Sequence, residues 1–217
     1  MDIDRSGKKG GKPMNEKFFN LPKEKQQAIL NAGYRVFSQN SYKKSPMSEI
    51  AAEAGISKGL LFHYFRNKKE LYLYLWDNCA RVTIEAMEKF DCYGGEDLFD
   101  CMLRGVHAKV SIIRQCPHMA LFTIRAFYEK NPEVCAAVQE SYHKYFNFKA
   151  DSTLMNLDPE KFIPGLDIRM MYQDMYWASE GYLWEVTQRG EVDMEEMEQV
   201  FYRMVEFWKS VYKRKEG

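Results

Sequence analysis

Three consecutive residues, Ser57, Lys58 and Gly59, combine a hydroxyl group, an ammonium group and a position without a side chain. Serine is favoured immediately before the first turn of a helix, so a short helix is expected to begin here. The free amides and the dipole at a helix start attract phosphate groups. This segment is therefore suited to contact a polyanion.

The flanking residues indicate a helix-turn-helix. Ser45-Pro46 is typical of a helix start, and Gly55 can adopt the left-handed conformation that ends this helix after about Ala54. A second helix is expected over residues 57–64. The residues at the expected contact between the two helices are small or apolar: Ile50, Ala51, Ala54 and Ile56. In such motifs the start of the second helix enters the major groove of DNA.

Helical periodicity continues along the rest of the chain. One helix is expected over residues 23–39, and Asn67-Lys68-Lys69-Glu70 has the form of a capping box that opens a long helix towards Phe90. Later helices are separated at Pro117, at Asn131-Pro132, in a loop over 158–165 and at Gly190. The sequence predicts an all-α fold of about nine helices. Its predicted parts are a disordered basic arm over 1–14, a three-helix helix-turn-helix domain over 15–66 and a larger helical domain over 67–217.

The charge is distributed unevenly along a chain whose formal net charge is zero. Residues 1–76 carry 14 Lys and Arg against 7 Asp and Glu, and the remaining residues carry 17 against 24. A basic end on an acidic body favours contact of that end with a polyanion. The basic arm over residues 1–14 is either part of the natural protein or an extension that was added to it artificially.

Composition excludes several classes of protein. No apolar run is long enough to cross a membrane and the first residues do not form a signal peptide, so we expect a cytoplasmic protein with no membrane partner. The five widely spread cysteines favour buried, reduced thiols. Cys116-Pro117-His118 offers two possible metal ligands, which do not make a site. Because no phosphate loop, His-Glu-x-x-His pattern or nucleophile elbow is present, we expect neither an enzyme nor a cofactor.

The stretch from Ile50 to Phe65 reads Ile-Ala-Ala-Glu-Ala-Gly-Ile-Ser-Lys-Gly-Leu-Leu-Phe-His-Tyr-Phe and is followed by Asn-Lys-Lys-Glu-Leu at 67–71. Together with Ala28-Ile29 and the Ala32-Gly33…Phe37 pattern, it resembles the DNA-binding signature of the TetR family. The resemblance covers about residues 20–76. Beyond residue 76 it is architectural, in length, helix count and two long terminal helices.

This resemblance implies contacts between the second helix and DNA bases. Lys58 would donate hydrogen bonds to guanine, Gly59 would allow close approach of the backbone, and Leu60 would touch a thymine methyl group. Phe65 would lie in the core. Phe62 lacks the hydroxyl of the Tyr that is frequent at its position, so one backbone contact would be missing.

The resemblance also implies contacts with phosphates. Lys68 would bind a phosphate at the start of the long helix, as would Ser45 and Ser48 near the start of the preceding short helix. His63 and Tyr64 would reach phosphates or base edges. The complete expected set is Ser45, Ser48, Ser57, Lys58, Gly59, Leu60, His63, Tyr64 and Lys68.

For the helical body the resemblance implies ligand binding and dimerisation. The last two helices, expected over about 167–189 and 192–213, would form a four-helix bundle across a two-fold axis. Their broad apolar faces fit this role, although such stripes are more often core or interface than a ligand pocket. In the helix expected over 167–189, one face has Met171, Met175, Ala178 and Tyr182. The adjacent face of the same helix has Met170, Trp177, Gly181 and Trp184. Polar candidates for orienting a ligand are His107, His118, Arg125, Tyr128, Tyr142, Gln173 and Glu180.

The sequence thus predicts a transcriptional regulator that binds double-stranded DNA, as a homodimer on a palindrome, and represses until a small-molecule effector of unknown identity binds. One alternative is a DNA binder controlled by a protein partner, which an absence of any cavity in the body would favour. Another is a small-molecule binding module whose helix-turn-helix is vestigial.

Overall fold

The computed structural model describes residues 16–94, 97–154, 157–189 and 193–215, and for residues 145–153 and 187 it describes the backbone alone. The predicted arm over 1–14 lies outside the described residues. The helices are α1 (Glu16–Phe19), α2 (Lys23–Gln39), α3 (Met47–Glu53), α4 (Lys58–Tyr64), α5 (Lys68–Lys89), α6 (Leu98–Gln115), α7 (Pro117–Phe127), α8 (Cys135–Leu154), α9 (Ile168–Arg189) and α10 (Met194–Tyr212), with a 3-10 turn over Pro159–Lys161. The predicted all-α fold is confirmed, and only the four-residue α1 adds to the nine expected helices.

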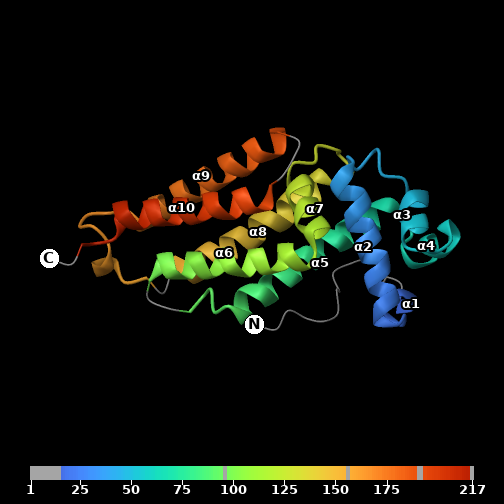
Figure 1. Ribbon diagram of the computed structural model, residues 1–217, viewed down its shortest axis with the longest axis horizontal. Helices are drawn as coiled ribbons and strands as arrows, with labels where there is room; N and C mark the ends of the chain where they lie inside the picture. Colours follow the sequence, from blue (N-terminus) through green and yellow to red (C-terminus); the bar gives the residue numbers. More distant parts are fainter. Residues whose placement is uncertain (1–15, 95–96, 155–156, 190–192, 216–217) are drawn as a thin grey trace.

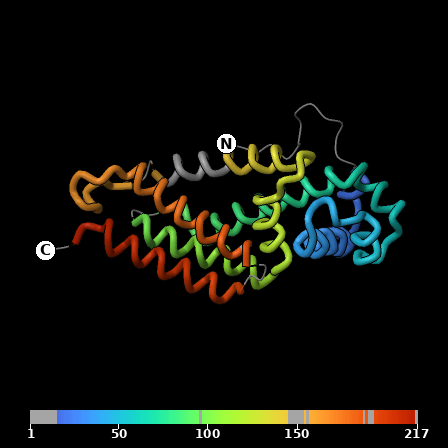
Figure 2. The backbone as a smooth tube through the Cα atoms, turned by 90° about the horizontal axis from the view of Figure 1, so that it is seen from above, coloured from blue at the N-terminus to red at the C-terminus, as the bar shows by residue number. Residues whose placement is uncertain are grey.

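The small helices α1–α4 lie at one end of an elongated molecule, and α5 runs from among them into a body formed with α6, α8, α9 and α10 (Figures 1 and 2). Helix α7 lies at the junction, where it makes the most extensive helix–helix contact of the fold, with α2. No helix within the described residues has the length and apolar character needed to cross a membrane.

Local signals set the ends of the short helices as expected. Gly55 has a φ of 68°, in the left-handed region, between α3 and α4. The Ser57 hydroxyl accepts a hydrogen bond from the Leu60 amide at 3.1 Å, and the Asn67 side chain accepts one from the Glu70 amide at 2.8 Å. The Glu70 carboxylate accepts the amide of Arg66, the residue before the cap, at 2.6 Å, so it reaches one residue beyond the Asn67 amide that a capping box would use.

Helix α3 begins differently from the prediction. Its N-cap is Pro46, and no side chain caps it. Ser45 is fully buried, and its hydroxyl donates to the carbonyl of Ser41 at 3.0 Å. The predicted Ser45 cap is therefore wrong, and the hydroxyl is used inside the turn instead of facing a phosphate.

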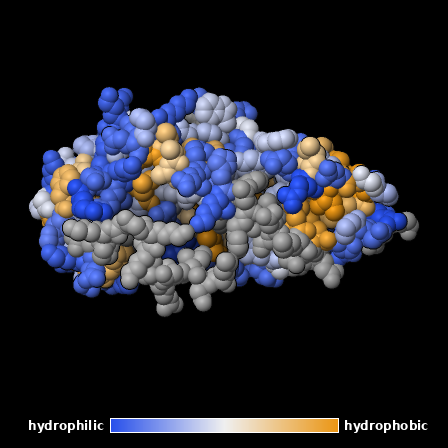
Figure 3. Space-filling model, turned by 180° about the vertical axis from the view of Figure 1, so that it is seen from behind, coloured by the Kyte–Doolittle hydropathy of each residue, from blue (hydrophilic) through white to orange (hydrophobic). Residues whose placement is uncertain are grey.

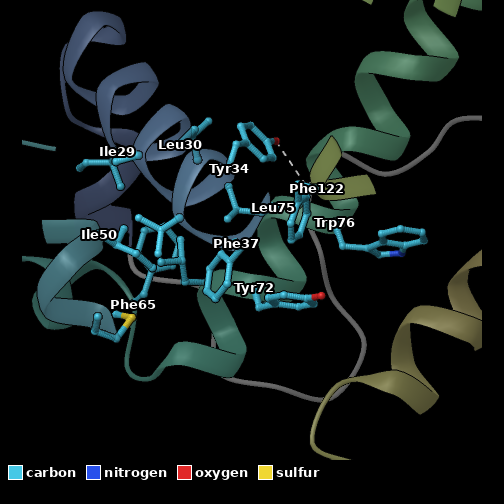
Figure 4. Packing of buried hydrophobic residues seen from close by; sticks show 14 of the residues in the cluster. Ile29, Leu30, Tyr34, Phe37, Ile50, Phe65, Tyr72, Leu75, Trp76 and Phe122 are labelled. Carbon is cyan, nitrogen blue, oxygen red and sulfur yellow. Dashed lines mark hydrogen bonds between the residues drawn. The ribbon is translucent and has the colours of Figure 1, made fainter. Parts of the chain in front are cut away.

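The main hydrophobic cluster joins the helix-turn-helix to α5, α7 and α8. Figure 4 shows Phe122 of α7 among aromatic residues of α2 and α5. The Phe122 ring centroid lies 5.6 Å from that of Tyr34, 6.0 Å from Phe37 and 5.0 Å from Tyr72. Because this cluster continues across the boundary predicted between residues 66 and 67, the division into two domains stays a prediction.

A hydrogen-bonded tyrosine reinforces the contact between α2 and α5. The Tyr34 hydroxyl donates to the carbonyl of Leu75 at 3.3 Å and accepts from the amide group of Asn78 at 2.7 Å. Burial raises the pKa of Tyr34 well above its ordinary value, so the hydroxyl stays protonated and can donate. The tie fixes α5 against α2 at the point where α5 leaves the helix-turn-helix.

The body has a second cluster, in which α6, α9 and α10 meet. It contains Leu98, Phe99, Phe162, Met171, Met175, Val205 and Trp208. Helix α6 joins α7 through a single residue, Cys116, whose amide donates to the carbonyl of Ile112 at 2.8 Å. Pro117 is then the first residue of α7, as its missing amide hydrogen permits.

We expect Phe122→Ala to lower the free energy of unfolding by about 3–5 kcal/mol. The side chain is completely buried, so its removal leaves a cavity among the rings of α2 and α5. Urea denaturation followed by circular dichroism measures the loss. Phe122→Leu, which retains most of the volume, should cost much less. Equal and small losses in both variants would contradict the importance given to this ring.

Candidate DNA-binding surface and interior cavity

Helix α4 has one buried and one exposed face. Leu61 is completely buried and Tyr64 is 8% exposed, so both belong to the core side. The opposite side exposes Lys58, Gly59, Leu60, Phe62 and His63. The helix start, capped by Ser57, therefore presents a lysine and an uncrowded glycine to solvent, as a recognition helix requires.

Gly59 leaves open space at the start of α4. The closest atom to the position that its Cβ would take is the Ser57 hydroxyl, at 4.0 Å. No packing within the described part of the chain therefore requires a glycine here. The start of α4 therefore has room for close approach of an external group.

The expected DNA contacts fall into two groups. Ser48, Ser57, Lys58, Gly59, Leu60 and His63 are exposed and Lys68 is partly exposed, whereas Ser45 and Tyr64 are buried, as is Phe65 outside this set. Phe65 was expected in the core. The Tyr64 ring packs against Phe18 at a centroid distance of 6.2 Å. The body of Tyr64 is thus structural, and a contact with DNA could involve only its exposed margin.

Lys68 is engaged within the protein. Its ammonium group donates to the carbonyl of Tyr42 at 2.8 Å and to that of Lys43 at 3.4 Å. It also lies 4.4 Å from the centroid of the Tyr42 ring, within reach of a cation–π interaction. Lys68 therefore ties the start of α5 to the turn before α3, a role that the helix-start position did not reveal. Lys43 and its neighbour Lys44 are exposed in that turn and were not singled out from the sequence.

The body contains a partly open cavity of about 400 Å³ bordered by α5, α6, α7, α8, α9 and α10. Most of its lining is apolar, from Trp76 and Met119 at α5 and α7 to Phe201 and Trp208 of α10. This size and character are typical of sites for small organic ligands.

A group of polar side chains interrupts this apolar lining. The Tyr142 hydroxyl donates to the Glu180 carboxylate at 3.1 Å, and the Tyr128 hydroxyl donates to the Glu180 backbone carbonyl at 3.2 Å. Burial raises the pKa of Glu180 above that of an ordinary glutamate and also raises the pKa of both tyrosines. Hence the cavity wall contains a hydrogen-bonded acid among tyrosine hydroxyls.

Three of the seven polar residues proposed from the sequence, Tyr128, Tyr142 and Glu180, lie together at the cavity. The other four, His107, His118, Arg125 and Gln173, are not among its lining residues. His107 and Arg125 are on the exposed sides of their helices. The His118 ring approaches the Ser38 hydroxyl at 3.5 Å, at the junction of α7 with α2.

Sequence reasoning missed Lys109. This residue lines the cavity from α6, in helical register with Met102, Val106 and Ile113. A lysine within an otherwise apolar stripe was the signal that could have identified it. Trp76, which was counted only as part of a long helix, also lines the cavity.

Comparison with known proteins agrees with this geometry. Residues 29–75 match the family described as bacterial regulatory proteins, tetR family. The fatty acid metabolism regulator protein of Bacillus subtilis (strain 168) is 24% identical over 152 residues, which cover 70% of this chain and 78% of that relative.

Solved structures share the fold over most of the chain. SmeT, the repressor of the Stenotrophomonas maltophilia multidrug efflux pump SmeDEF, has a TM-score of 0.65 at 14% identity and covers 91% of this chain and 93% of its own. The transcriptional regulator FadR from Bacillus subtilis in complex with stearoyl-CoA has a TM-score of 0.60 at 19% identity. The match covers 84% of this chain and 96% of the FadR chain.

The matched segment, residues 29–75, contains the helix-turn-helix and its exposed recognition helix. Its relatives are regulators, and the fold continues through α10. The chain therefore shares its DNA-binding segment with the tetR family of bacterial regulatory proteins, and most of its length shares the fold of solved transcriptional regulators.

Proposed function

We propose that this protein is a ligand-responsive transcriptional repressor that binds a palindromic operator as a homodimer. The cavity of about 400 Å³ carries the proposal, because residues in its wall also belong to the cluster that holds the helix-turn-helix. A ligand there would touch the same packing that orients α4.

The exposed start of α4 supports the DNA contacts of the proposal. Lys58 would donate to guanine acceptors in the major groove while Gly59 allows close approach. Ser48 and Ser57, both exposed, would reach the phosphates that flank these bases. Lys68 is left out of this set, because its ammonium group is bound to backbone carbonyls.

The exposed faces of α9 and α10 support a homodimer. Trp177 and Met170 are each 57% exposed on α9, and Phe207 is 63% exposed on α10. Gly181 lies within α9 on the same face as Trp177, and apart from the backbone of α9 itself no atom of the described residues lies within 4 Å of the position where its Cβ would stand. A glycine in mid-helix is unfavourable unless something approaches closely, and a second copy of the chain provides that contact.

The path from the cavity to DNA is short. Trp76 and Cys79 of α5 and Met119 of α7 each line the cavity and belong to the cluster that includes Phe37 and Leu61. A ligand that binds one arrangement of α5 and α7 more tightly than another would shift the orientation of α4. In a dimer this changes the spacing of the two recognition helices, and the fit to both half-sites is lost.

The effector would contain a long apolar portion. Aliphatic, methionine and aromatic side chains form most of the cavity wall, and methionines adapt readily to flexible chains. The names of a fatty acid metabolism regulator and of FadR in complex with stearoyl-CoA support this ligand class.

The two alternatives are less well supported. Control by a protein partner does not require an interior cavity of this size. A vestigial helix-turn-helix does not require the exposed Lys58 and the open position at Gly59.

Selection from random duplex DNA tests the proposal. The purified protein should retain fragments with a palindromic motif, and a long-chain effector should release that operator. Retention without any motif, from a folded dimer at moderate salt, would count against the operator. Operator binding that no cavity-binding compound alters would count against ligand control alone.

Lys58→Ala should lower affinity for the selected operator by about tenfold or more, because one base contact is worth about 1–3 kcal/mol. Fluorescence anisotropy with labelled operator measures the change. The free energy of unfolding should not change, since Lys58 is exposed.

Two lysines serve as controls. Lys89→Ala removes an exposed charge at the end of α5 and should leave operator affinity nearly unchanged. Lys68→Met should lower stability by about 1–3 kcal/mol through loss of its carbonyl contacts. An operator affinity in Lys58→Ala equal to that of Lys89→Ala would exclude the base contact.

Phe207→Glu should weaken the dimer by about 2 kcal/mol or more, roughly thirtyfold in its dissociation constant, because a carboxylate would be buried at the apolar contact. Sedimentation equilibrium measures the association. Operator binding should weaken with it, since one monomer reads only one half-site.

Gln199→Glu is the matched control, because it adds the same charge at an exposed polar position of α10. Its dimer should be as stable as that of the wild type. Should Phe207→Glu remain fully dimeric, the contact between copies must lie elsewhere.

A further inference from the structure

Lys109 is the residue of the cavity whose chemistry fits its surroundings least well. It belongs to α6, on the stripe of Met102, Val106 and Ile113 that faces the interior. Removing an ammonium group from water is costly unless it is paired. A leucine or methionine would complete this apolar stripe at no such cost. The lysine therefore has a role other than packing.

Neighbouring protein atoms displace water from around the Lys109 ammonium group, and this desolvation lowers its pKa from the ordinary value. The residue is nevertheless exposed by surface area, and it lines the cavity. The lowered pKa and the exposed surface of Lys109 are consistent with each other if the exposed part of the side chain lies in the cavity. The ammonium group thus faces the space that a ligand would fill.

Neither a hydrogen bond nor an ion pair joins Lys109 to another residue in the described part of the chain. It interacts through space with Glu180 and with the Cys92 thiol. The Glu180 carboxylate, however, already accepts from Tyr142. The other acid at the cavity, Glu198, lies 3.6 Å from the guanidinium group of Arg114. The acids therefore have other partners, and the ammonium group lacks a close acceptor.

A second donor at the same cavity lacks an acceptor. The indole Nε1 of Trp76 is buried and has no hydrogen-bond partner among the described residues. Figure 4 shows Trp76 pointing away from the other labelled side chains of its cluster. A buried donor without a partner is unfavourable, so a bound molecule that offers an acceptor would be stabilised there.

We propose that Lys109 binds the anionic group of an amphiphilic effector, a carboxylate or a phosphate ester, whose apolar chain occupies the rest of the cavity. The inference rests on the proposed use of the cavity as the effector site. Trp76 would donate to an acceptor atom that a ligand brings to its own part of the cavity wall. A cationic amphiphile is excluded, because its head group would meet the Lys109 ammonium.

Four probes with the same twelve-carbon chain test the head group: dodecanoate, dodecyl phosphate, dodecanol and dodecyltrimethylammonium, each below its micelle-forming concentration. Isothermal titration calorimetry should show the wild type binding one or both anions at least about tenfold more tightly than dodecanol. The two anions distinguish a carboxylate from a phosphate. The ammonium compound should bind more weakly than dodecanol.

Lys109→Met removes the charge and keeps the length of the side chain. The Lys109→Met variant should bind the two anions at least about tenfold more weakly than the wild type does, and it should bind dodecanol with unchanged affinity. Lys109→Arg should keep the preference of the wild type for the anions. Without ligand, Lys109→Met should melt at a higher temperature than the wild type, because a partly desolvated charge without a close partner has been removed from the cavity wall. Lys89→Met, at an exposed lysine, should change neither property.

Two outcomes would overturn this assignment. If Lys109→Met binds dodecanoate and dodecyl phosphate as tightly as the wild type, Lys109 is no anion contact, although the cavity remains a ligand site. If the folded wild type binds none of the four probes, the use of the cavity for long-chain ligands also fails.

Discussion

The packing of α7 against α2 holds the DNA-binding helices in a fixed orientation on the body. Phe122 lies at its centre, in contact with rings from α2 and α5, and the Tyr34 hydroxyl reinforces the same place by donating to Leu75. Interiors packed at this density do not deform gradually, so a displacement of α7 must be taken up by moving whole helices. The exposed face of α4 is therefore aimed by contacts that it does not itself make.

The same two helices border the cavity. Met119 of α7 and Trp76 of α5 contribute to the lining and to the cluster of the helix-turn-helix. The cavity and the core of the helix-turn-helix consequently share residues, and no long relay of side chains is needed between them. The face seen in Figure 3 also gathers hydrophobic residues on the part of the body farthest from the helix-turn-helix, so apolar surface is not confined to the interior.

Local chemistry made much of this fold predictable. Gly55, Ser57 and Asn67 specify turn and cap geometry within a few residues, and the structure places them as expected. Ser45 and Lys68 have partners that the local sequence did not reveal: the Ser45 hydroxyl donates within a turn, and the Lys68 ammonium group donates to carbonyls 25 and 26 residues away.

For the cavity, periodicity identified the helices but not which face of each points inward. Tyr128, Tyr142 and Glu180 were therefore proposed together with His107 and Arg125, which lie on exposed sides of their helices.

The single residue that joins α6 to α7 has a consequence for how such a chain can vary over evolution. With only Cys116 between them, the two helices form a rigid elbow, and an added residue would turn α7 out of phase with α2. The connection between α7 and α8, residues 128–134, could absorb such an insertion at its surface. Among descendants of this sequence, the connection between α7 and α8 should vary in length, whereas the connection between α6 and α7 should keep its single residue.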